Sequence, residues 1–371
     1  MADRSRVLLL SRYGKLGASS RLRLFQYIPF LERTGIEVVV SPFFDDVYLN
    51  HLYSTGKRRF KNAYAAYLRR FRAVKSARNY STVWIEKEVF PFLPAWFETL
   101  IIRSGVPYVV DYDDAIFHNY DQHRLAVVHG LLGKKLDSLL ANSKCVTVGN
   151  GYLESYVRSH GAKIVRRIPT VVDIRRFNVV EEPDSKELRI GWIGSAATTK
   201  YLYLVQDALK LLSIERPIRL ITIGASPLHD YDVPLEQHPW SENSEAQLLA
   251  SVHVGIMPLP DNPWERGKCG YKLIQYMACG RPVVASPVGV NRDIVMNAVG
   301  YLADGTEEWA QSLRAFADNP GHRRSCGGEG RRLVEREYSL QVIAPRVVDI
   351  LREAASMNGL INETSSAAHL Q

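Results

Sequence analysis

Short apolar runs alternate with stretches of helical periodicity along almost the entire chain. In the first half, β-branched and aromatic runs predict strands at residues 7–11, 36–40, 82–85, 108–111, 145–148 and 164–168. Apolar residues at helical spacing between these runs predict helices at residues 21–33, 94–103, 125–140 and 152–159. Nearly continuous apolar strands that are separated by helices are typical of a parallel sheet covered on both faces. We therefore expect an α/β fold.

The alternation lapses once, near residues 178–187, where the sequence is polar and contains Pro183. It then restarts, with strands expected at residues 188–193, 219–223, 252–258 and 282–286 and helices at residues 201–213, 245–250, 271–278 and 290–297. Three further helical stretches lie at residues 307–317, 330–337 and 341–355. We infer two α/β domains, residues 1–175 and 188–340, joined by a linker at residues 176–187. Residues 341–371 are expected to form a helix that returns to the first domain, followed by a frayed tail.

The composition excludes several classes of protein. Apolar residues make up 46% and charged residues 23% of the 371 residues, which rules out a disordered or fibrous chain. The apolar run at residues 7–10 is too short for a signal peptide, and no run is long enough to span a membrane. The four cysteines lie far apart and show no zinc-binding spacing. We therefore expect a cytoplasmic protein with reduced thiols.

A glycine-containing loop before the expected helix at residues 271–278 is the clearest functional signal. Lys268 lies in this loop, and Lys272 lies in the first turn of the helix. The first turn of a helix presents free backbone N–H groups and a positive dipole end, which bind phosphate. A second strand-to-helix turn, at residues 191–195, is followed by Lys200. Two such turns with nearby lysines predict a site for a nucleotide diphosphate.

The run Met-Ala-Cys-Gly-Arg-Pro-Val-Val-Ala-Ser at residues 277–286 resembles the donor site of the family 4 glycosyltransferases. Residues 169–173 stand where that family has its interdomain Asn-Gly-Val-Asp, and residues 191–200 stand where its diphosphate-binding Gly-Arg and Lys occur. The resemblance implies the GT-B fold, with two Rossmann-like doubly wound parallel-sheet domains facing an interdomain cleft. It also implies a retaining transferase that uses a nucleotide-diphosphate sugar, without a cofactor or a metal.

The resemblance assigns the donor-binding residues to the second domain. Gly267 and Gln275 stand in place of two family glutamates, Ser195 stands in place of the phosphate-binding arginine, and Lys268 replaces a glycine. We expect Lys268 to restore the missing cation and Glu265 to substitute for the first glutamate. Such departures are typical of a divergent branch among bacterial enzymes of surface-polysaccharide and O-antigen synthesis. The donor-binding set is Gly194, Ser195, Lys200, Gly224, Glu265, Gly267, Lys268, Gly270, Tyr271, Lys272 and Gln275.

Carboxylates that follow the expected strands of the first domain predict an acceptor site, because strand carboxyl ends are where ligands bind in such sheets. The glycine-containing turn after the first strand would also approach this ligand closely. We assign acceptor and sugar binding to Gly17, Ser19, Arg21, Glu86, Asp113 and Asp114. The three aspartates at residues 111–114 leave a divalent metal as an alternative. His118 either orients the sugar or is a packed histidine.

The implied mechanism relies on electrostatic stabilisation of a leaving phosphate. A nucleotide diphosphate departs with its own negative charge, so the protein must neutralise that charge and exclude water. Lys200, Lys268 and the helix N-terminus near Gly270 would supply positive charge, and Asp114 and His118 complete the expected catalytic set. The leaving phosphate can itself take the proton of the acceptor hydroxyl, so no strong protein base is required.

The positive charge of the chain is concentrated in one segment. The formal net charge is +8, yet residues 57–78 alone contain nine Lys and Arg and no Asp or Glu. Apolar residues recur there at helical spacing, which predicts a basic amphipathic helix with its aromatic face packed inward. Such a helix is typical of membrane-surface binding, which we assign to Arg58, Arg59, Arg69, Arg70, Arg72 and Lys75. We therefore expect a peripheral protein on the inner face of the cytoplasmic membrane, with an anionic lipid surface and a lipid-linked or oligosaccharide acceptor as partners.

Other interpretations remain open at this point. The basic helix alternatively packs on the sheet and only exposes a solvated basic face. The same charges could bind nucleic acid, but no nucleic-acid-binding module accompanies them, and we expect no such partner. The missing glutamates would also suit a sugar-nucleotide epimerase of the GT-B fold, or a scaffold without catalysis.

Overall fold

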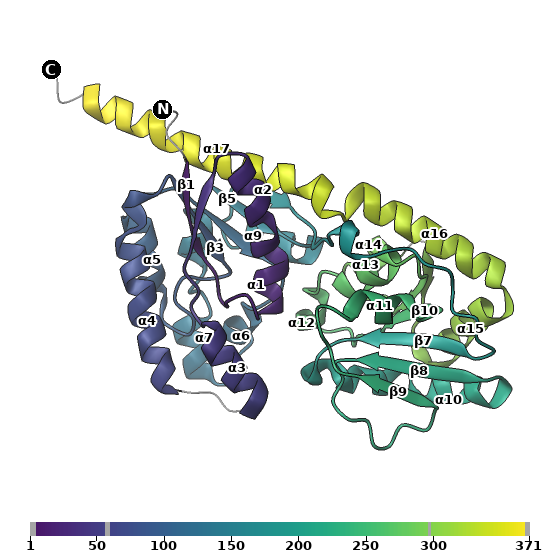
Figure 1. Ribbon diagram of the computed structural model, residues 1–371. Coiled ribbons are helices and arrows are strands. Elements are labelled where there is room, and N and C mark those ends of the chain that lie inside the picture. Colours follow the sequence, from purple (N-terminus) through teal and green to yellow (C-terminus); the bar gives the residue numbers. More distant parts are fainter. Residues whose placement is uncertain (1–4, 56–59, 296–297, 368–371) are drawn as a thin grey trace. The chain divides into compact units, whose positions relative to one another are not determined.

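The computed structural model describes residues 5–55, 60–295 and 298–367 of the chain, which forms two compact units. Unit 1 consists of Met1–Pro169 together with Ile343–Gln371, and unit 2 consists of Thr170–Val342. The chain therefore passes from unit 1 to unit 2 after Pro169, ahead of the linker expected at residues 176–187. Each unit is built on its own parallel sheet with helices around it (Figure 1).

Unit 1 contains a six-stranded parallel sheet of order β2-β1-β3-β4-β5-β6. Its strands are β1 (Arg6–Leu10), β2 (Glu37–Val40), β3 (Thr82–Glu86), β4 (Tyr108–Tyr112), β5 (Cys145–Val148) and β6 (Val165–Arg167), and all six expected strands are confirmed. The inner strands β3, β4 and β5 are buried at every residue, as their unbroken apolar runs require. The register pairs Glu86 with Asp111, so the carboxyl ends of β3 and β4 lie side by side.

The helices of unit 1 cover this sheet. They are α1 (Ala18–Arg23), η1 (Phe25–Tyr27), α2 (Ile28–Arg33), α3 (Asp46–Thr55), α4 (Phe60–Lys75), η2 (Ala77–Asn79), α5 (Ala95–Arg103), α6 (His118–Asp121), α7 (Ala126–Leu132), α8 (Asp137–Ala141) and α9 (Gly151–Ser159), where η marks a 3-10 helix. The single helix expected at residues 125–140 is wrong, because the chain forms α7 and α8 instead. Between them, the buried Lys135 turns its ammonium to Glu88 at 2.6 Å, and this contact interrupts the helix.

Unit 2 contains a six-stranded parallel sheet of order β12-β11-β10-β7-β8-β9. Its strands are β7 (Leu188–Ile193), β8 (Ile218–Ile223), β9 (Leu235–His238), β10 (Val254–Met257), β11 (Val283–Ala285) and β12 (Gly300–Leu302). The four strands expected from the sequence are confirmed, whereas β9 and β12 are not predicted by it. Both lie at the edges of the sheet, where a strand is only half-covered and needs no continuous apolar run.

The helices of unit 2 are η3 (Ile174–Arg176), η4 (Ala196–Leu204), α10 (Gln206–Glu215), α11 (Glu245–Ala250), α12 (Pro263–Arg266), α13 (Tyr271–Ala278), α14 (Asn291–Ile294), α15 (Gly305–Asp318) and α16 (Pro320–Glu337). The helix expected to begin at residue 330 begins at Pro320, because its four glycines hide the helical pattern. One of them, Gly327, lets α16 pack closely on the end of α13. A Cβ at Gly327 would lie 2.1 Å from the carbonyl oxygen of Gly280.

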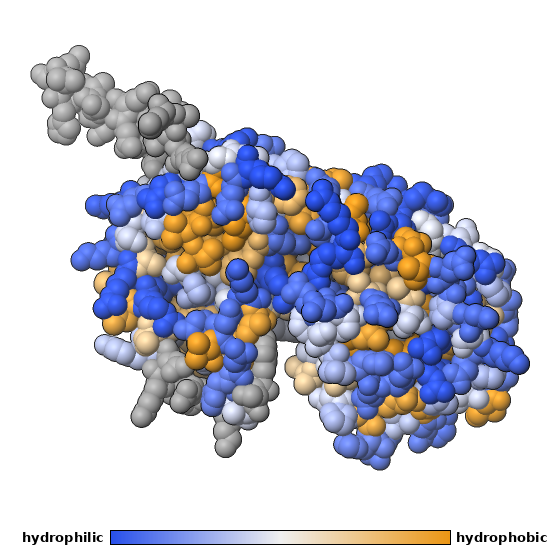
Figure 2. Space-filling model, in the orientation of Figure 1, coloured by the Kyte–Doolittle hydropathy of each residue, from blue (hydrophilic) through white to orange (hydrophobic). Residues whose placement is uncertain are grey.

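The last helix, α17 (Leu340–Ala367), begins in unit 2 and belongs to unit 1 from Ile343 onwards. Arg346 and Arg352 fasten it to unit 1 by donating hydrogen bonds of 2.8 Å to the carbonyl oxygens of Arg167 and Thr34. In the described ranges, no helix combines the length and apolarity needed to cross a membrane. On the face shown in Figure 2, hydrophobic residues (orange) form small groups among hydrophilic ones (blue).

Candidate active site

In unit 2 the strand order reverses between β7 and β10, since β8 and β9 extend the sheet on one side and β11 and β12 on the other. Ligands of open parallel sheets bind outside the carboxyl ends of the strands at such a switch point. Residues 194–200 follow β7, Gly224 follows β8, and residues 258–275 follow β10 and open α13. We call these three segments the β7–β10 edge, and they contain every donor-binding residue expected from the sequence.

Two glycines let β7 and β8 end in close contact at this edge. Gly224 has a φ of +76°, and a Cβ there would lie 2.5 Å from the carbonyl oxygen of Gly194. A Cβ at Gly194 would lie 2.2 Å from the ring of Trp192. Neither position accepts another residue without a shift, so the bare backbone forms the surface of the edge here.

Helix α13 begins at this edge and is fastened to β7. Gly270, the residue before the helix, has a φ of +67°, and a Cβ there would lie 2.4 Å from Cδ1 of Ile294. Tyr276 of the helix accepts a hydrogen bond of 2.9 Å from the backbone N–H of Ile193, the last residue of β7. Its ring fills the space beside Gly255. These contacts hold the first turn of α13, with its positive dipole end, beside β7.

Two buried side chains at the edge carry polar atoms without a hydrogen-bond partner in the described part of the chain. Glu265 is 4% exposed; Tyr201 donates a hydrogen bond to its Oε1, while Oε2 has no partner. Gln275 is 2% exposed, and its Nε2 has no partner. A buried unpaired polar atom costs about 1–3 kcal/mol, so both atoms favour a ligand that pairs with them. An acceptor and a donor of hydrogen bonds together suit a ligand with hydroxyl groups.

Three lysines bring positive charge to the same edge. Lys200 is exposed, and its ammonium lies 5.4 Å from the ring centroid of Tyr201. The ammonium of Lys268 lies 5.4 Å from the ring centroid of Trp264, and that of Lys272 lies 4.4 Å from the ring centroid of Trp192. Burial lowers the pKa of Lys272 to about 7, and repulsion by Lys268 adds to the decrease.

The remaining predicted donor residues have local structural roles. Ser195 caps η4 in a capping box with Thr198, and its side chain is exposed. Gly267 ends α12, where its N–H donates a hydrogen bond of 3.2 Å to the carbonyl oxygen of Trp264. Tyr271 is half-buried and packs against the core of unit 2. These three residues shape the loops that carry the lysines and the glutamate.

In unit 1 the strand order reverses between β1 and β3, and four polar side chains meet at the carboxyl ends of these strands and β4. We call them the Ser19 cluster: Ser19, Glu86, Lys87 and Asp113. The hydroxyl of Ser19 lies 2.7 Å from Oδ2 of Asp113 and 3.1 Å from Oε1 of Glu86. Lys87 donates a hydrogen bond of 3.0 Å to Ser19 and forms an ion pair of 2.8 Å with Asp113. Three predicted acceptor-site residues are thus brought together around a lysine.

Lys87 adopts an unusual backbone conformation within this cluster. Its φ is +68°, in the left-handed region that residues with a Cβ rarely adopt, and the residue is only 3% exposed. Asp114 adds a second carboxylate, 3.5 Å from its ammonium. Such strain persists only where the surroundings enforce it, and it concentrates at functional sites.

The two carboxylates of the Ser19 cluster have opposite pKa shifts. Burial by itself would raise the pKa of Asp113, but the charges of Lys87 and Arg23 outweigh it and lower that pKa to about 2. For Glu86, burial raises the pKa, and this effect exceeds the opposing charge of Lys87. The cluster therefore presents one firmly ionised carboxylate beside one that binds a proton more readily, a combination suited to hydrogen bonds with hydroxyl groups.

Gly17, Arg21 and His118 lie near this end of unit 1 in different settings. Gly17 precedes α1, and a Cβ there would lie 2.3 Å from Cβ of Tyr13. Arg21 is half-buried on α1. The ring nitrogens of His118 lie 2.8 Å from Asp121 and 2.7 Å from the hydroxyl of Tyr152. Both nitrogens are thus engaged within the fold, which favours the packed histidine over a sugar-orienting one.

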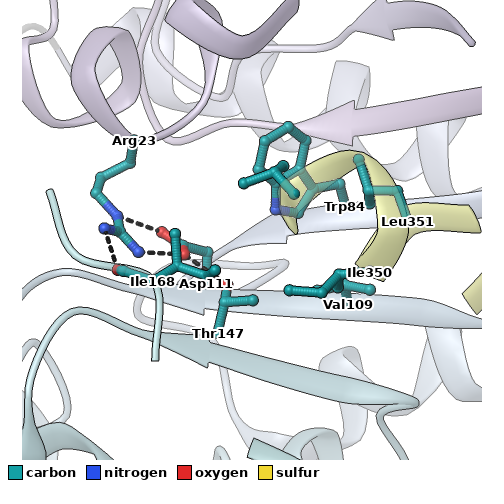
Figure 3. Close-up of a pocket in the computed structure, with 9 residues that line it drawn as sticks. Arg23, Trp84, Val109, Asp111, Thr147, Ile168, Ile350 and Leu351 are labelled. Carbon is teal, nitrogen blue, oxygen red and sulfur yellow. Dashed lines mark hydrogen bonds and ion pairs between the residues drawn. The ribbon is translucent and has the colours of Figure 1, made fainter. Parts of the chain in front are cut away.

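Buried ion pairs support the cluster, and the sequence analysis missed them. Arg23 binds Asp111 through two hydrogen bonds, of 2.6 and 3.0 Å, and donates a third, of 2.7 Å, to the carbonyl oxygen of Ile168. Figure 3 shows this pair in the wall of a small cavity that Leu351 of α17 also lines. The sequence contains a signal for the burial of Arg23. Arg23 lies four residues before Tyr27 and eight before Leu31, which places it on the same helix face as these apolar residues.

A second buried network lies around Glu88, the residue after Lys87. Arg12 forms an ion pair of 2.7 Å with Glu88, and Lys135 forms one of 2.6 Å. Lys135 also lies 3.2 Å from the buried Glu98. These pairs tie the loops after β1 and β3 to the segment between α7 and α8, and so hold the Ser19 cluster in position.

Helix α4 confirms the expected basic helix but exposes different residues. Tyr64, Leu68 and Phe71 are 77%, 38% and 48% exposed, so the aromatic face does not pack inward as expected. The assignment of Arg70 to a membrane surface is wrong, because Arg70 is 1% exposed and donates a hydrogen bond of 2.5 Å to the carbonyl oxygen of Ser11. Ala66, Arg70 and Val74, spaced by four residues, form the stripe that packs inward.

The other basic residues assigned to this surface differ in their exposure. Arg72 and Lys75 are exposed. Arg69 is 44% exposed and forms an ion pair of 3.2 Å with Asp45. Arg58 and Arg59 lie outside the described residues. The outward face of α4 therefore combines Arg69, Arg72 and Lys75 with Tyr64, Leu68 and Phe71.

Comparison with known proteins finds a family match within the second unit. Residues 187–319 match the family described as Glycosyl transferases group 1. A GDP-mannose-dependent monoacylated alpha-(1-6)-phosphatidylinositol monomannoside mannosyltransferase of Corynebacterium glutamicum is 31% identical over 85 residues. This match covers 22% of the chain and only 22% of the length of that relative.

Solved structures resemble nearly the whole chain. One is Alr3699/HepE of Anabaena in complex with UDP, with 14% identity and a TM-score of 0.70, covering 94% of this chain and 100% of that one. Another is sucrose-phosphate synthase from Thermosynechococcus elongatus, with 16% identity and a TM-score of 0.71. The match covers 95% of this chain and 100% of that one. At these identities the likeness shows a shared fold.

Proposed function

We propose that the protein is a glycosyltransferase using a nucleotide-diphosphate sugar, because residues 187–319 match the Glycosyl transferases group 1 family and the chain has the GT-B fold. The observation that carries the proposal is the composition of the β7–β10 edge. A helix N-terminus, three lysines and two buried polar atoms without partners meet at the switch point of one sheet. Similar structures contain UDP or UDP-glucose, and the curated relative depends on GDP-mannose.

The β7–β10 edge is proposed to hold the donor. The first turn of α13 and the ammonium groups of Lys200, Lys268 and Lys272 attract the diphosphate. Oε2 of Glu265 accepts a hydrogen bond from a sugar hydroxyl, and Nε2 of Gln275 donates one to a ribose hydroxyl, which would satisfy both unpaired atoms. This arrangement supplies, with different residues, the contacts that the family resemblance ascribes to two glutamates and an arginine.

The Ser19 cluster is proposed to bind the acceptor. Its carboxylates accept hydrogen bonds from sugar hydroxyls, and Asp114 extends this set. With Glu86, Asp113 and Asp114 around one lysine, the cluster repels phosphate and favours a saccharide. The acceptor would thus present hydroxyl groups at this end of unit 1.

The proposed reaction retains the anomeric configuration. Asp113 is a poor base for an acceptor hydroxyl, since its pKa is lowered to about 2. The leaving phosphate is the better proton acceptor, and Lys200 and Lys268 would stabilise its charge. We propose that these cations replace the divalent ion used by other transferases, so that the reaction is independent of metal.

We further propose that the protein acts on a lipid-linked saccharide at the inner face of the cytoplasmic membrane, in bacterial polysaccharide or O-antigen synthesis. The outward face of α4 supports this location, because it combines three cations with exposed aromatic and aliphatic side chains. Anionic lipid attracts each such cation by about 1 kcal/mol, and aromatic side chains settle at the lipid–water boundary.

An assay of nucleotide release tests the proposed activity. Wild-type protein with UDP-glucose or GDP-mannose, and octyl glucoside or octyl mannoside as acceptor, should release nucleotide and form a glycosylated octyl product. Lys200→Ala and Lys268→Ala should each lower this rate by ~10²-fold or more, as loss of an oxyanion-stabilising group does.

Other products would contradict the proposal. An isomerised sugar nucleotide without transfer would indicate an epimerase, and binding of a donor without any release would indicate a scaffold. Lys210→Ala, at an exposed lysine of α10 paired with Asp232, is the matched control and should keep the wild-type rate.

A further inference from the structure

Lys272 has no counter-charge in the described part of the chain. Its ammonium lies 4.4 Å from the ring centroid of the fully buried Trp192, and no described carboxylate lies within 4.0 Å of it. Glu265, the buried acid of the same edge, is engaged by the hydroxyl of Tyr201. The charged group that acts on Lys272 is Lys268, which repels it.

Lys272 is half-buried, so its ammonium is only partly hydrated. Contact with an aromatic ring offsets only part of the free energy of removing an ammonium from water. Binding of an anion or loss of the proton relieves the remainder. The same edge contains the first turn of α13 and the unpaired atoms of Glu265 and Gln275, which are both more than nine-tenths buried. The surroundings of Lys272 are thus prepared for an anionic ligand that also forms hydrogen bonds.

We propose that the diphosphate of the donor is the counter-ion of Lys272, and that binding of the donor is coupled to uptake of up to one proton from solvent by this lysine. The inference rests on the proposed function of the β7–β10 edge as the donor site. It adds that donor binding is coupled to the protonation of Lys272. In the empty protein Lys272 is partly a neutral amine, and in the complex it is an ammonium paired with phosphate. No covalent bond changes in this step.

The groups that face Lys272 determine the sign of the coupling. Burial and Lys268, in the loop before α13, both disfavour its charged form, and its pKa is lowered to about 7. Trp192 of β7 is neutral, and Glu265 of α12 is bound to Tyr201 of η4. A bound diphosphate favours the charged form and returns the pKa towards its ordinary value of about 10.4. The affinity of the protein for the donor should therefore be constant well below pH 7 and should fall as the pH rises above 7.

Calorimetric titration measures this proton directly. Binding of UDP-glucose and of GDP-mannose is measured at pH 6, 7 and 8 in two buffers that differ in ionisation enthalpy. The diphosphate of these sugars has no group that titrates in this range, so proton uptake reports on the protein. We expect uptake of about 0.5 proton per bound donor at pH 7 and about 0.9 at pH 8. The affinity for the donor should fall about fivefold from pH 7 to pH 8.

Three variants separate this coupling from simple loss of charge. Lys272→Arg keeps its charge at every pH and should bind without proton uptake and with constant affinity between pH 6 and 8. Lys272→Met should bind at least ~10-fold more weakly at pH 7, also without uptake. Lys268→Met should weaken binding yet keep the uptake, with its midpoint moved to higher pH because the repulsion is gone.

The outcomes distinguish the inference from the proposed function. Tight binding by the wild type without proton uptake, or uptake that persists in Lys272→Arg, overturns the inference and leaves the proposed function intact. If neither nucleotide sugar binds to wild-type protein that is folded by circular dichroism, both the proposed donor site and the inference are overturned.

Discussion

The hydroxyl of Ser19 lies 2.7 Å from Asp113, although 94 positions separate the two residues in the sequence. Ser19 has one proton and also lies 3.1 Å from Glu86, while it accepts a hydrogen bond from Lys87. Ser19 therefore holds two carboxylates within hydrogen-bond distance of one hydroxyl group. Burial raises the pKa of Glu86, whereas the charges of Lys87 and Arg23 outweigh burial and lower the pKa of Asp113. The two carboxylates that contact Ser19 thus differ in how readily they bind a proton.

Replacement of Lys87 should disrupt this cluster. Lys87→Met leaves the largely buried Asp113 without its ion pair of 2.8 Å, which we expect to lower the free energy of unfolding by about 3 kcal/mol. Urea unfolding at pH 7 measures the change. Lys134→Met, at an exposed lysine of the same unit, is the control and should change stability by less than about 0.5 kcal/mol. Equal effects of the two substitutions would contradict the role of Lys87.

Acid should destabilise the protein partly through Asp113. A group whose pKa is lower in the folded state than its ordinary value of about 3.9 stabilises the fold above that value. This contribution is lost as the pH falls from about 4 towards the folded pKa of about 2. Urea midpoints measured between pH 5 and pH 2.5 should therefore fall less steeply in Asp113→Asn than in the wild type. Parallel curves would show that Asp113 is not ionised through this interval.

The buried pair of Arg23 and Asp111 should be essential to the fold of unit 1. Arg23→Met leaves the carboxylate of Asp111 buried and unpaired, at an expected loss of about 3–5 kcal/mol in unfolding free energy. The double variant Arg23→Met with Asp111→Leu should regain part of this loss, because no charge remains buried. Arg6→Met, which breaks an exposed pair with Glu37, should cost less than about 1 kcal/mol. A double variant that is less stable than Arg23→Met would refute the explanation.

Gly224 should be required both for stability and for donor binding. Gly224→Ala adds the penalty of a positive φ, about 1–2 kcal/mol, to a Cβ that approaches Gly194 at 2.5 Å. Gly105→Ala is a matched control, since Gly105 has a φ of +74° but no atom within 4 Å of the added Cβ. Thermal unfolding with and without UDP-glucose or GDP-mannose measures both effects. Only Gly224→Ala should lose the stabilisation by nucleotide.

The outward face of α4 should bind anionic membranes. Arg72→Gln with Lys75→Gln, and separately Tyr64→Ser with Phe71→Ser, should each reduce sedimentation with phosphatidylglycerol vesicles by ~5-fold or more at low salt. Arg332→Gln with Arg336→Gln removes two exposed charges of α16 and should leave sedimentation unchanged. Wild-type protein that binds phosphatidylcholine vesicles equally well, or binds neither, would argue against a membrane location.

The sequence by itself determined the α/β alternation, the inner strands of both sheets and the loop that opens α13. These features depend on local information. Unbroken apolar runs specify buried parallel strands, and the glycine-containing loop with its lysines specifies a helix N-terminus that favours phosphate. The edge strand β9, Leu-Glu-Gln-His, was missed because a strand covered on one side needs no apolar run.

Only the tertiary structure decided which charges meet and which are buried. Ser19, Lys87 and Asp113 follow three different strands, and their contact depends on the order β1-β3-β4 in the sheet. Arg70 belongs to the same run of basic residues as Arg69 and Arg72, yet the rotation of α4 turns it inward to the carbonyl oxygen of Ser11. A charge pattern identifies a basic helix, but the face that packs depends on partners distant in the chain, because burial results from the sheet on which the helix lies.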